Sequence, residues 1–192
     1  MKIIFCLFFI FIFHNSYSEE QKIYLAGGCF WCLEEAFQDE KGVISAISGY
    51  SGGHTINPTY KEVSRGDTGH IEALEVIYED KIVSINQIFN IFFQNIDPFD
   101  GNGQFCDRGY HYQSAIFISN EKIKNLSNKY ISIIENLYNQ KVKTLLLDFD
   151  KFYNAEDYHQ DYYIKNPIRY NYYKKGCGRT KRLKQISLQI NG

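Results

Sequence analysis

The chain has 192 residues, with 21 Lys and Arg against 22 Asp and Glu, so its formal net charge is −1. One domain is expected at this length, because about 150 residues is typical of a domain, and the balanced charge excludes nucleic-acid binding driven by bulk electrostatics. Aromatic residues make up 17% of the chain and only 3 residues are Pro, which argues against a disordered or low-complexity protein.

The first eighteen residues form a separate segment. Lys2 precedes an apolar run over residues 3–13, and Ser16-Tyr17-Ser18 follows it. The run is far shorter than the roughly 20 apolar residues that span a bilayer, so residues 1–18 are predicted to be a secretory signal peptide cleaved after Ser18. The protein is then exported, periplasmic or secreted, with one domain over residues 19–192. The alternative is an uncleaved membrane anchor through residues 3–13.

Hydrophobic periodicity predicts the remaining elements. In chain order they are a strand at 23–27, a helix at 29–39, strands at 43–50 and 71–78, a helix at 85–96, a strand at 113–119, a helix at 121–138, a strand at 142–147 and a helix at 155–164. Polar loops are expected over residues 54–70 and 97–112.

Three details of these elements can be tested. Ser84 is the expected N-cap of the second helix, whose apolar positions Ile85, Ile88, Phe89, Phe92, Phe93 and Ile96 fit a period of 3.6. In the first helix, Phe30, Leu33 and Phe37 share the apolar face, with Glu34 and Glu35 opposite. The basic segment 174–182 is predicted to be a solvated, mobile end.

The first six elements follow the order β-α-β-β-α-β. This is the split βαβ order of ferredoxin-like α+β sandwiches, so the predicted fold is such a sandwich with C-terminal extensions wrapped around it.

Removal of residues 1–18 leaves four cysteines, and the chemistry concentrates at Cys29. It follows Gly27-Gly28 and opens a predicted helix, where free backbone N–H groups and the helix dipole stabilise a thiolate, the nucleophilic form of cysteine. A disulfide partner or a packed core thiol is the alternative interpretation. Export makes both a disulfide-stabilised binding protein and a disulfide enzyme possible.

Cys32 forms a Cys-x-x-Cys pair with Cys29, which is also typical of thioredoxin-like oxidoreductases. Attachment of c-type haem would need His after the second cysteine, where Leu33 stands. Zinc could use Cys29, Cys32, Cys106 and Cys177, but the last two lack a paired spacing, so no metal site is predicted.

Several spaced motifs together resemble the peptide methionine sulfoxide reductase A family, over residues 23–186. They are Gly27-Gly28-Cys29-Phe30-Trp31-Cys32-Leu33-Glu34, Gly49-Tyr50-Ser51-Gly52-Gly53, Asn57-Pro58-Thr59-Tyr60-Lys61-Glu62-Val63, Gly66-Asp67-Thr68-Gly69-His70-Ile71-Glu72, Gln94-Asn95-Ile96-Asp97-Pro98, Asp107-Arg108-Gly109-Tyr110-His111-Tyr112-Gln113-Ser114-Ala115-Ile116 and Phe152-Tyr153-Asn154-Ala155-Glu156-Asp157-Tyr158-His159-Gln160. The family's ferredoxin-like α+β core agrees with the element order.

The resemblance implies a repair enzyme that reduces methionine S-sulfoxide, in proteins and free. Cys29 would attack the sulfoxide sulfur and become a sulfenic acid, and Glu72 would supply the proton. Glu72, Tyr60 and Tyr112 would contact the sulfoxide oxygen, with Asp107 nearby. Phe30 and Trp31 would hold the ε-methyl group, and this dry pocket would raise the pKa of Glu72. From the residues alone, Glu72 and Glu75 on the same strand are equal candidates.

Turnover by such an enzyme needs a second thiol, and the family pattern leaves its identity open. Cys177, between Gly176 and Gly178, is the predicted resolving cysteine, with Cys32 as the nearer alternative and Cys106 as a third. By the resemblance, the enzyme would bind no cofactor and would draw electrons from an external thioredoxin-like dithiol. Its other partners would be oxidised proteins or peptides, without nucleic acid, and with a membrane only if the N-terminal segment is retained. A monomer is expected.

Overall fold

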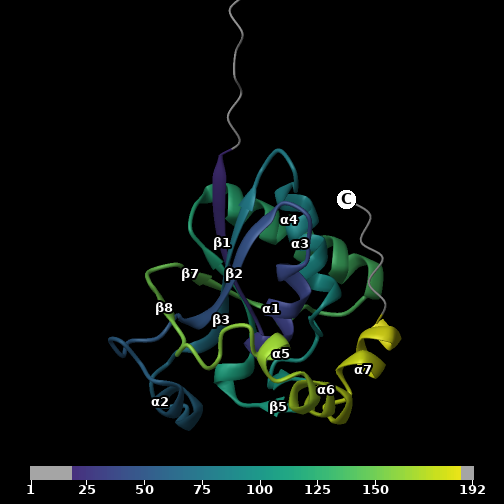
Figure 1. Cartoon of the computed structure of the whole chain (residues 1–192). Helices are drawn as coiled ribbons and strands as arrows, with labels where there is room; N and C mark the ends of the chain where they lie inside the picture. Colours follow the sequence, from purple (N-terminus) through teal and green to yellow (C-terminus); the bar gives the residue numbers. More distant parts are fainter. Residues whose placement is uncertain (1–18, 187–192) are drawn as a thin grey trace, which may run out of the picture.

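Residues 19–186 are described by the computed structural model of the chain (Figure 1). The predicted signal peptide, residues 1–18, lies outside the described residues. Within residues 19–186 there is no helix with the length and apolar character needed to cross a membrane.

A six-stranded mixed sheet forms the centre of the α+β fold. Its strand order is β7-β6-β1-β3-β2-β8, so β3 lies between β1 and β2. Neighbouring strands are antiparallel except β6 and β7, which are parallel. The strands are β1 (Glu20–Gly27), β2 (Val43–Ser51), β3 (Ile71–Glu79), β6 (Ser114–Ile118), β7 (Leu145–Asp148) and β8 (Phe152–Asn154).

The main core lies between this sheet and three helices, α1 (Phe30–Gln38), α3 (Ile85–Gln94) and α4 (Glu121–Tyr138), which Figure 1 shows along one side of the sheet. Every second residue of β1 and β3 faces the helices, and apolar residues spaced three or four apart on the helices face the sheet. These spacings follow from the period of 2 in a strand and 3.6 in a helix. The buried side chains include Ile23, Leu25, Leu33, Phe37, Leu74, Val76, Phe89, Phe92, Ile116, Tyr130 and Ile134.

The two long central helices match their predictions closely. Ser84 is the N-cap of α3, and its hydroxyl accepts the N–H of Gln87 in a capping box. The apolar residues Ile88, Phe89, Phe92 and Phe93 are all buried. In α4 the predicted bounds hold, and Ile123, Tyr130 and Ile134 are buried, whereas Leu137 in the last turn is 57% exposed.

Both predicted polar loops contain short elements that carry pocket residues. The first contains α2 (Tyr60–Arg65), which begins with a capping box between Thr59 and Glu62. The second contains the hairpin strands β4 (Gly103–Gln104) and β5 (Asp107–Arg108), followed by the 3-10 turn η1 (Tyr110–Tyr112).

The predicted helix over residues 155–164 is wrong for residues 155–161, and only its end, from Tyr162, is helical. Ala155 continues from β8 alongside β2, because its N–H donates to the carbonyl of Ser48. Residues 157–161 form turns, and the Gln160 side chain bonds both the N–H and the carbonyl of Ser48. Asp161, with φ 55°, then turns the chain into α5 (Tyr162–Lys165). The tyrosines of this segment are therefore not on one helix face.

The prediction of a mobile basic end is also wrong. Residues 174–182 belong to α6 (Pro167–Gly176), α7 (Arg179–Ile186) and the turn between them. Arg179 is 3% exposed and donates to the carbonyls of Gly27 and Asn95, while Cys177 is bonded to Cys106. Burial of a cation is tolerated here because carbonyl oxygens solvate the guanidinium group. The extension thereby covers the start of α1.

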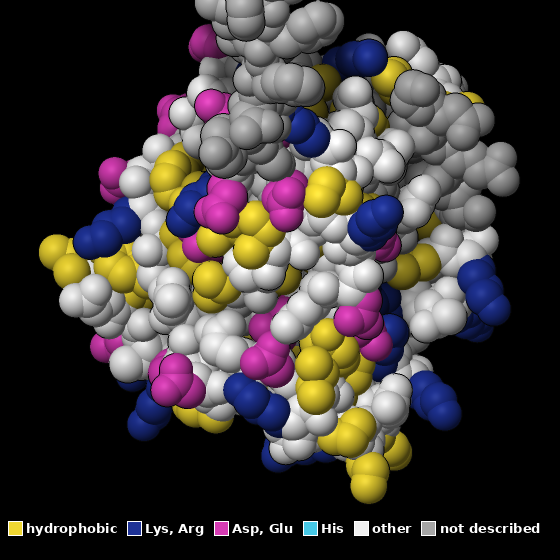
Figure 2. Space-filling model, turned by 45° about the horizontal axis from the view of Figure 1, so that its top comes forward, with side chains coloured by type: hydrophobic (Ala, Val, Ile, Leu, Met, Phe, Trp, Pro, Cys, Tyr) yellow, Lys and Arg dark blue, Asp and Glu magenta, His cyan; other side chains and the backbone are white. Residues whose placement is uncertain are grey.

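The surface agrees with the near-zero net charge. In Figure 2, acidic and basic side chains alternate over the visible face, without a large region of one sign.

Candidate active site

A cavity of about 120 Å³ lies at the N-terminal end of α1, where segments distant in sequence meet. It is lined by Cys29, Phe30, Trp31, Tyr60, Glu72, Asp107, Tyr112 and Tyr173. Seven of these eight residues are the predicted site residues, so the structure brings together all of the predicted catalytic and substrate-binding side chains.

Cys29 is the N-cap of α1, and the following Phe30 is its first helical residue. Cys29 and Cys32 are both buried free thiols, 6% and 4% exposed. Cys32 lies one helical turn after Cys29, and its backbone N–H donates to the Cys29 carbonyl at 3.1 Å. Both side chains belong to one buried cluster, and Cys29 is the one that lines the cavity.

The pKa values of Cys29 and Cys32 shift in opposite directions, and the shift at Cys29 differs from the prediction. Burial raises the pKa of Cys29 well above its ordinary value, whereas the hydrogen bond from Cys29 lowers the pKa of Cys32 to about 6. Arg179 and Lys174 lower the pKa of Cys32 further. Burial and the neighbouring Cys32 thus raise the pKa of Cys29, contrary to the lowering expected from its place before α1, whereas the nearby cations favour charge on Cys32.

Glu72 reaches the cavity from β3 and is 2% exposed. Its Oε2 accepts the backbone N–H of Phe30 at 3.1 Å. Burial raises the pKa of Glu72 well above its ordinary value, more than this hydrogen bond lowers it. A carboxyl group in this state can hold a proton at neutral pH, as the dry pocket predicts.

Three further groups face the same space. The hydroxyls of Tyr60 and Tyr112 are hydrogen-bonded to one another, and burial raises the pKa of both phenols, which keeps them protonated donors. Asp107 is half-buried, and its pKa is raised by burial while Tyr173 and Arg179 lower it. The cavity therefore offers two neutral hydroxyl donors beside two carboxyl groups.

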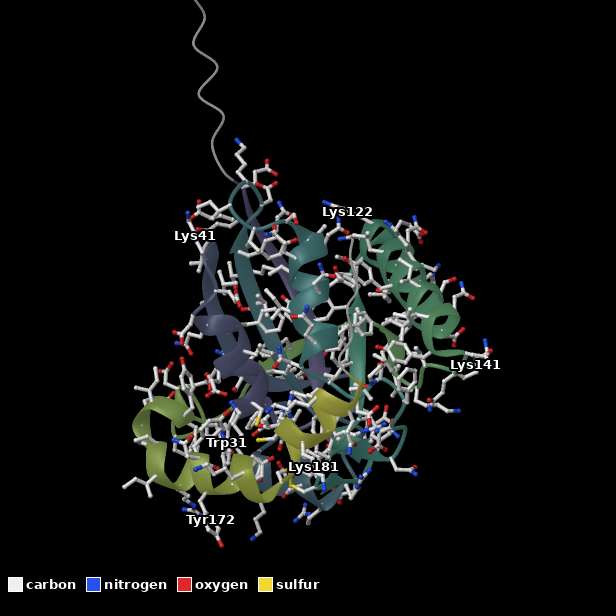
Figure 3. The ribbon with its side chains drawn as sticks, turned by 90° about the vertical axis from the view of Figure 1, so that its right-hand side faces the viewer. Trp31, Lys41, Lys122, Lys141, Tyr172 and Lys181 are labelled. Carbon is white, nitrogen blue, oxygen red and sulfur yellow. A yellow bond between two sulfur atoms is a disulfide. The ribbon has the colours of Figure 1, made fainter. Side chains whose placement is uncertain are left out.

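Aromatic rings form the apolar wall of the cavity. The ring of Trp31 stacks on Tyr162 with centroids 3.7 Å apart, and its Nε1–H donates to Nδ1 of His159 at 3.2 Å. Figure 3 places Trp31 where the C-terminal helices approach α1. Phe30 is buried and lies 5.0 Å from the His159 ring, centroid to centroid.

The prediction missed the supporting residues His159, Tyr162 and Glu156. Glu156 accepts the Tyr50 hydroxyl and the backbone N–H of Tyr60, and so fixes α2 at the cavity. Two of these residues, Glu156 and His159, stand in one of the motifs, but nothing in the motif shows which side chains they contact.

The remaining two cysteines, Cys106 and Cys177, form a disulfide. Cys106 is exposed, and Cys177 lies between α6 and α7 instead of on a mobile tail. The prediction that Cys177 resolves a sulfenic acid stays a prediction, since Cys177 can act as a thiol only after this bond opens. Within residues 19–186, one group has metal-ligand spacing, Cys106, Asp107 and Cys177, and its two sulfurs are those of the disulfide.

Tyr173 is the cavity residue that the sequence analysis did not select. It reaches the cavity from α6, lines it together with Cys29, and donates its hydroxyl to Oδ2 of Asp107. As one of 16 tyrosines, it carries no signal in the sequence that separates it from the others.

Taken together, the geometry suits redox chemistry on a small polar group with an apolar substituent. The aromatic wall can hold a methyl-sized group, the hydroxyls and Glu72 can bind and protonate an oxygen, and Cys29 can attack the atom between them.

Comparisons with known proteins agree with this geometry. The profile of the family described as "Peptide methionine sulfoxide reductase" matches residues 21–190. The chain is 48% identical over 168 residues to a Vibrio cholerae protein named MsrA/MsrB, covering 86% of this chain but only 44% of that protein. It is 42% identical over 166 residues to MsrA of Bacillus subtilis, covering 85% of this chain and 94% of that one.

Solved structures show the same similarity. Methionine sulfoxide reductase A of Corynebacterium diphtheriae is 30% identical, with a TM-score of 0.71 over 79% of this chain and 77% of that one. Reduced Mxr1 of Saccharomyces cerevisiae is also 30% identical, with a TM-score of 0.73 over 77% and 86% of the two chains. Mxr1 in complex with Trx2 matches at 18% identity and a TM-score of 0.50, over 78% and 91% of the chains, a likeness of fold alone. The chain belongs to the peptide methionine sulfoxide reductase family.

Proposed function

We propose that this protein reduces methionine S-sulfoxide, in proteins and as the free amino acid, by nucleophilic attack of Cys29. The observation that carries the proposal is the shared cavity, in which the Cys29 thiol, the buried Glu72 carboxyl and the Tyr60 and Tyr112 hydroxyls surround a space of about 120 Å³. Its size suits the methyl sulfoxide end of a side chain.

The first step transfers the oxygen. The Cys29 thiolate attacks the sulfoxide sulfur while Glu72 gives a proton to the oxygen, which Tyr60 and Tyr112 hold by hydrogen bonds. The sulfur–oxygen bond of the substrate then breaks, so that a thioether leaves and Cys29 carries the oxygen as a sulfenic acid. Cys29 is oxidised by two electrons and the substrate is reduced by two. Phe30 and Trp31 would hold the ε-methyl group during the attack.

The second step removes the oxygen as water when a thiol attacks the Cys29 sulfenic acid. We propose Cys32 for this role, because it is free, lies in the same buried cluster one helical turn from Cys29, and has a lowered pKa, which favours its thiolate. The product would be a Cys29–Cys32 disulfide. Cys177 is the alternative resolving cysteine, and its attack would first require reduction of the Cys106–Cys177 bond.

A thioredoxin-like dithiol protein is the proposed electron donor, with no bound cofactor. The complex of Mxr1 with Trx2, a chain of similar fold, supports this choice. The donor would return Cys29 and Cys32 to thiols and leave as a disulfide.

The proposed fold is a ferredoxin-like sandwich. The four strands β6-β1-β3-β2 are mutually antiparallel neighbours and α1 and α3 connect them on one side, which supports a split βαβ core with β7, β8 and α5–α7 as additions.

We propose export for the whole protein, as a single, monomeric catalytic domain over residues 19–192 behind a signal peptide. Cell fractionation and N-terminal sequencing of the purified protein test this. Recovery of the protein in the cytoplasm with an intact Met1 would contradict it.

The reaction is tested with the S and R epimers of methionine sulfoxide and dithiothreitol as the reductant. We expect wild type to reduce the S epimer and Cys29→Ser to be inactive on both epimers. An inactive wild type, or full activity in Cys29→Ser, would refute the proposal.

The resolving thiol is tested by mass spectrometry after one equivalent of sulfoxide. Cys177→Ser should accumulate a Cys29–Cys32 disulfide, whereas Cys32→Ser should retain the sulfenic acid, trapped by dimedone. A Cys29–Cys177 disulfide in wild type would show that Cys177 resolves instead.

A further inference from the structure

Burial raises the pKa of the Cys29 thiol, so attack on a sulfoxide requires a group that accepts its proton. Glu72 is the proposed proton donor to the oxygen, so it cannot serve as this acceptor. The remaining groups that act on Cys29 are Cys32 and Tyr173.

Tyr173 contacts Cys29 and a carboxylate at the same time. Tyr173 lines the same cavity as Cys29 and packs against the buried cluster that contains it, and its hydroxyl lies 2.5 Å from Oδ2 of Asp107. Tyr173 lowers the pKa of Cys29, against the larger effect of burial. Its ring meets Trp31 edge-on, with centroids 6.0 Å apart, which fixes the direction of the hydroxyl. Tyr173 therefore bridges the nucleophile and Asp107.

Asp107 is suited to exchange a proton through this bridge. Burial raises the pKa of Asp107, while Tyr173, Arg179 and Arg108 act in the opposite direction and favour its charged form. A carboxylate balanced in this way can take a proton from a neighbour without a large cost.

The disulfide holds both partners of this contact. Cys177 follows Tyr173 by one helical turn, and its N–H donates to the Tyr173 carbonyl at 2.8 Å. Cys106, to which Cys177 is bonded, immediately precedes Asp107. The Cys177 sulfur lies 4.0 Å from the Tyr173 hydroxyl and 3.9 Å from Oδ2 of Asp107.

We propose that Tyr173 is a further catalytic residue, which passes the Cys29 proton to Asp107. The Cys29 sulfur gives its proton to the Tyr173 oxygen as the Tyr173 hydroxyl gives its own proton to Oδ2 of the Asp107 carboxylate. Cys29 becomes a thiolate, Tyr173 stays neutral and Asp107 becomes a carboxylic acid. Two protons move together, the net transfer is one proton from Cys29 to Asp107, and no electrons are transferred. The role rests on the proposed function of Cys29 as the nucleophile.

The test is the pH dependence of Cys29 alkylation by iodoacetamide, followed on the Cys29 peptide by mass spectrometry. It is made in a Cys32→Ser background under non-reducing conditions, so that Cys32 cannot accept the proton and the Cys106–Cys177 bond stays intact. We expect Tyr173→Phe to slow alkylation of Cys29 at pH 7 by about tenfold, because a hydrogen bond to a charged group is lost. The profile should move to higher pH by about one unit.

Tyr163→Phe is the matched control. It removes the hydroxyl of a tyrosine that packs in the same cluster as Cys29 and whose hydroxyl has no hydrogen-bond partner among the described residues. It should leave the profile unchanged.

A second variant separates the relay from simple packing. Asp107→Asn should slow alkylation as Tyr173→Phe does, and the double variant should be no slower than either, since both interrupt one path. Additive effects, or a wild-type profile for Tyr173→Phe, would overturn the proposal. Alkylation needs no sulfoxide, so the relay can stand or fall independently of the sulfoxide assay.

Discussion

The carboxylate of Glu72 accepts the backbone N–H of Phe30, the residue that directly follows Cys29. This contact fixes the proposed proton donor against the first turn of the helix that carries the proposed nucleophile. Because both ends of the contact are buried, the relative position of the two groups is set before any substrate binds.

Replacement of Glu72 by Gln should preserve that contact and remove the proton. We expect the kcat for methionine S-sulfoxide to fall about 100-fold or more, since general acid catalysis typically contributes that much. In wild type the rate should decline as pH rises through the raised pKa of Glu72, and Glu72→Gln should lose this decline. Glu75→Gln, on the opposite face of β3 and paired with Lys22, is the control and should retain activity.

Glu34 predicts an unusual pH dependence of stability. It is completely buried in α1, where its Oε1 accepts the N–H of Asp161, and burial raises its pKa to about 7. The unfolded chain ionises this group near pH 4.3, so the fold must keep a proton that the unfolded state releases. The contribution of Glu34 to stability is therefore fully present below about pH 4.3 and is lost as the pH rises to about 7.

Over this pH range, Glu34 should lower the free energy of unfolding by an amount on the order of 3 kcal/mol. Urea denaturation between pH 4.5 and 7.5 measures it, and Glu34→Gln should flatten the profile. Glu40→Gln changes an exposed carboxyl just after the same helix and should not. Identical profiles for wild type and Glu34→Gln would contradict the assignment.

Loss of the Cys106–Cys177 disulfide should destabilise the fold. The bond links residues 71 apart, and closure of a loop of that length in the unfolded chain accounts for up to about 4 kcal/mol in the chain-entropy model. Thermal unfolding of Cys106→Ser/Cys177→Ser should show a lower Tm than oxidised wild type. Reduced wild type should behave like the variant, and a Tm equal to that of oxidised wild type would refute the prediction.

Trp31 is the only tryptophan of the chain, so its fluorescence reports on the cavity wall alone. Burial lowers the pKa of His159, whose Nδ1 accepts the Trp31 indole N–H. Protonation removes this acceptor, so the emission should change in acid, below the ordinary pKa of His near 6.5. His159→Gln should abolish the transition and His111→Gln, which has no recorded contact with Trp31, should not. A transition that survives in His159→Gln would assign it to another group.

The sequence predicts most of the framework because its periodic signals are local. Ser84 and the apolar positions after it determine α3 without reference to the remaining chain. The helix prediction for residues 155–160 fails for the opposite reason. The backbone of Ala155 and the side chain of Gln160 bond to Ser48, more than 100 residues earlier in the chain. Tertiary contacts of this kind override the local aromatic pattern.

The same distinction holds for the site. The motifs select Cys29, Glu72, Tyr60, Tyr112 and Asp107, and the structure gathers them in one cavity. Glu72 and Glu75 look equal in sequence, and they differ only because β3 turns Glu72 toward α1 and Glu75 toward Lys22 and Tyr24. The roles of Tyr173 and of the Cys106–Cys177 bond depend on where α6 lies, which no local pattern contains.

The position of Arg179 over the start of α1 has a consequence for the order in which the protein is made. Arg179 binds the carbonyl of Gly27, a residue 152 positions earlier in the chain. During synthesis from the N-terminus, Cys29 and Cys32 are therefore complete long before the residues that cover them exist. The two thiols therefore become fully buried only when the C-terminal helices dock on α1.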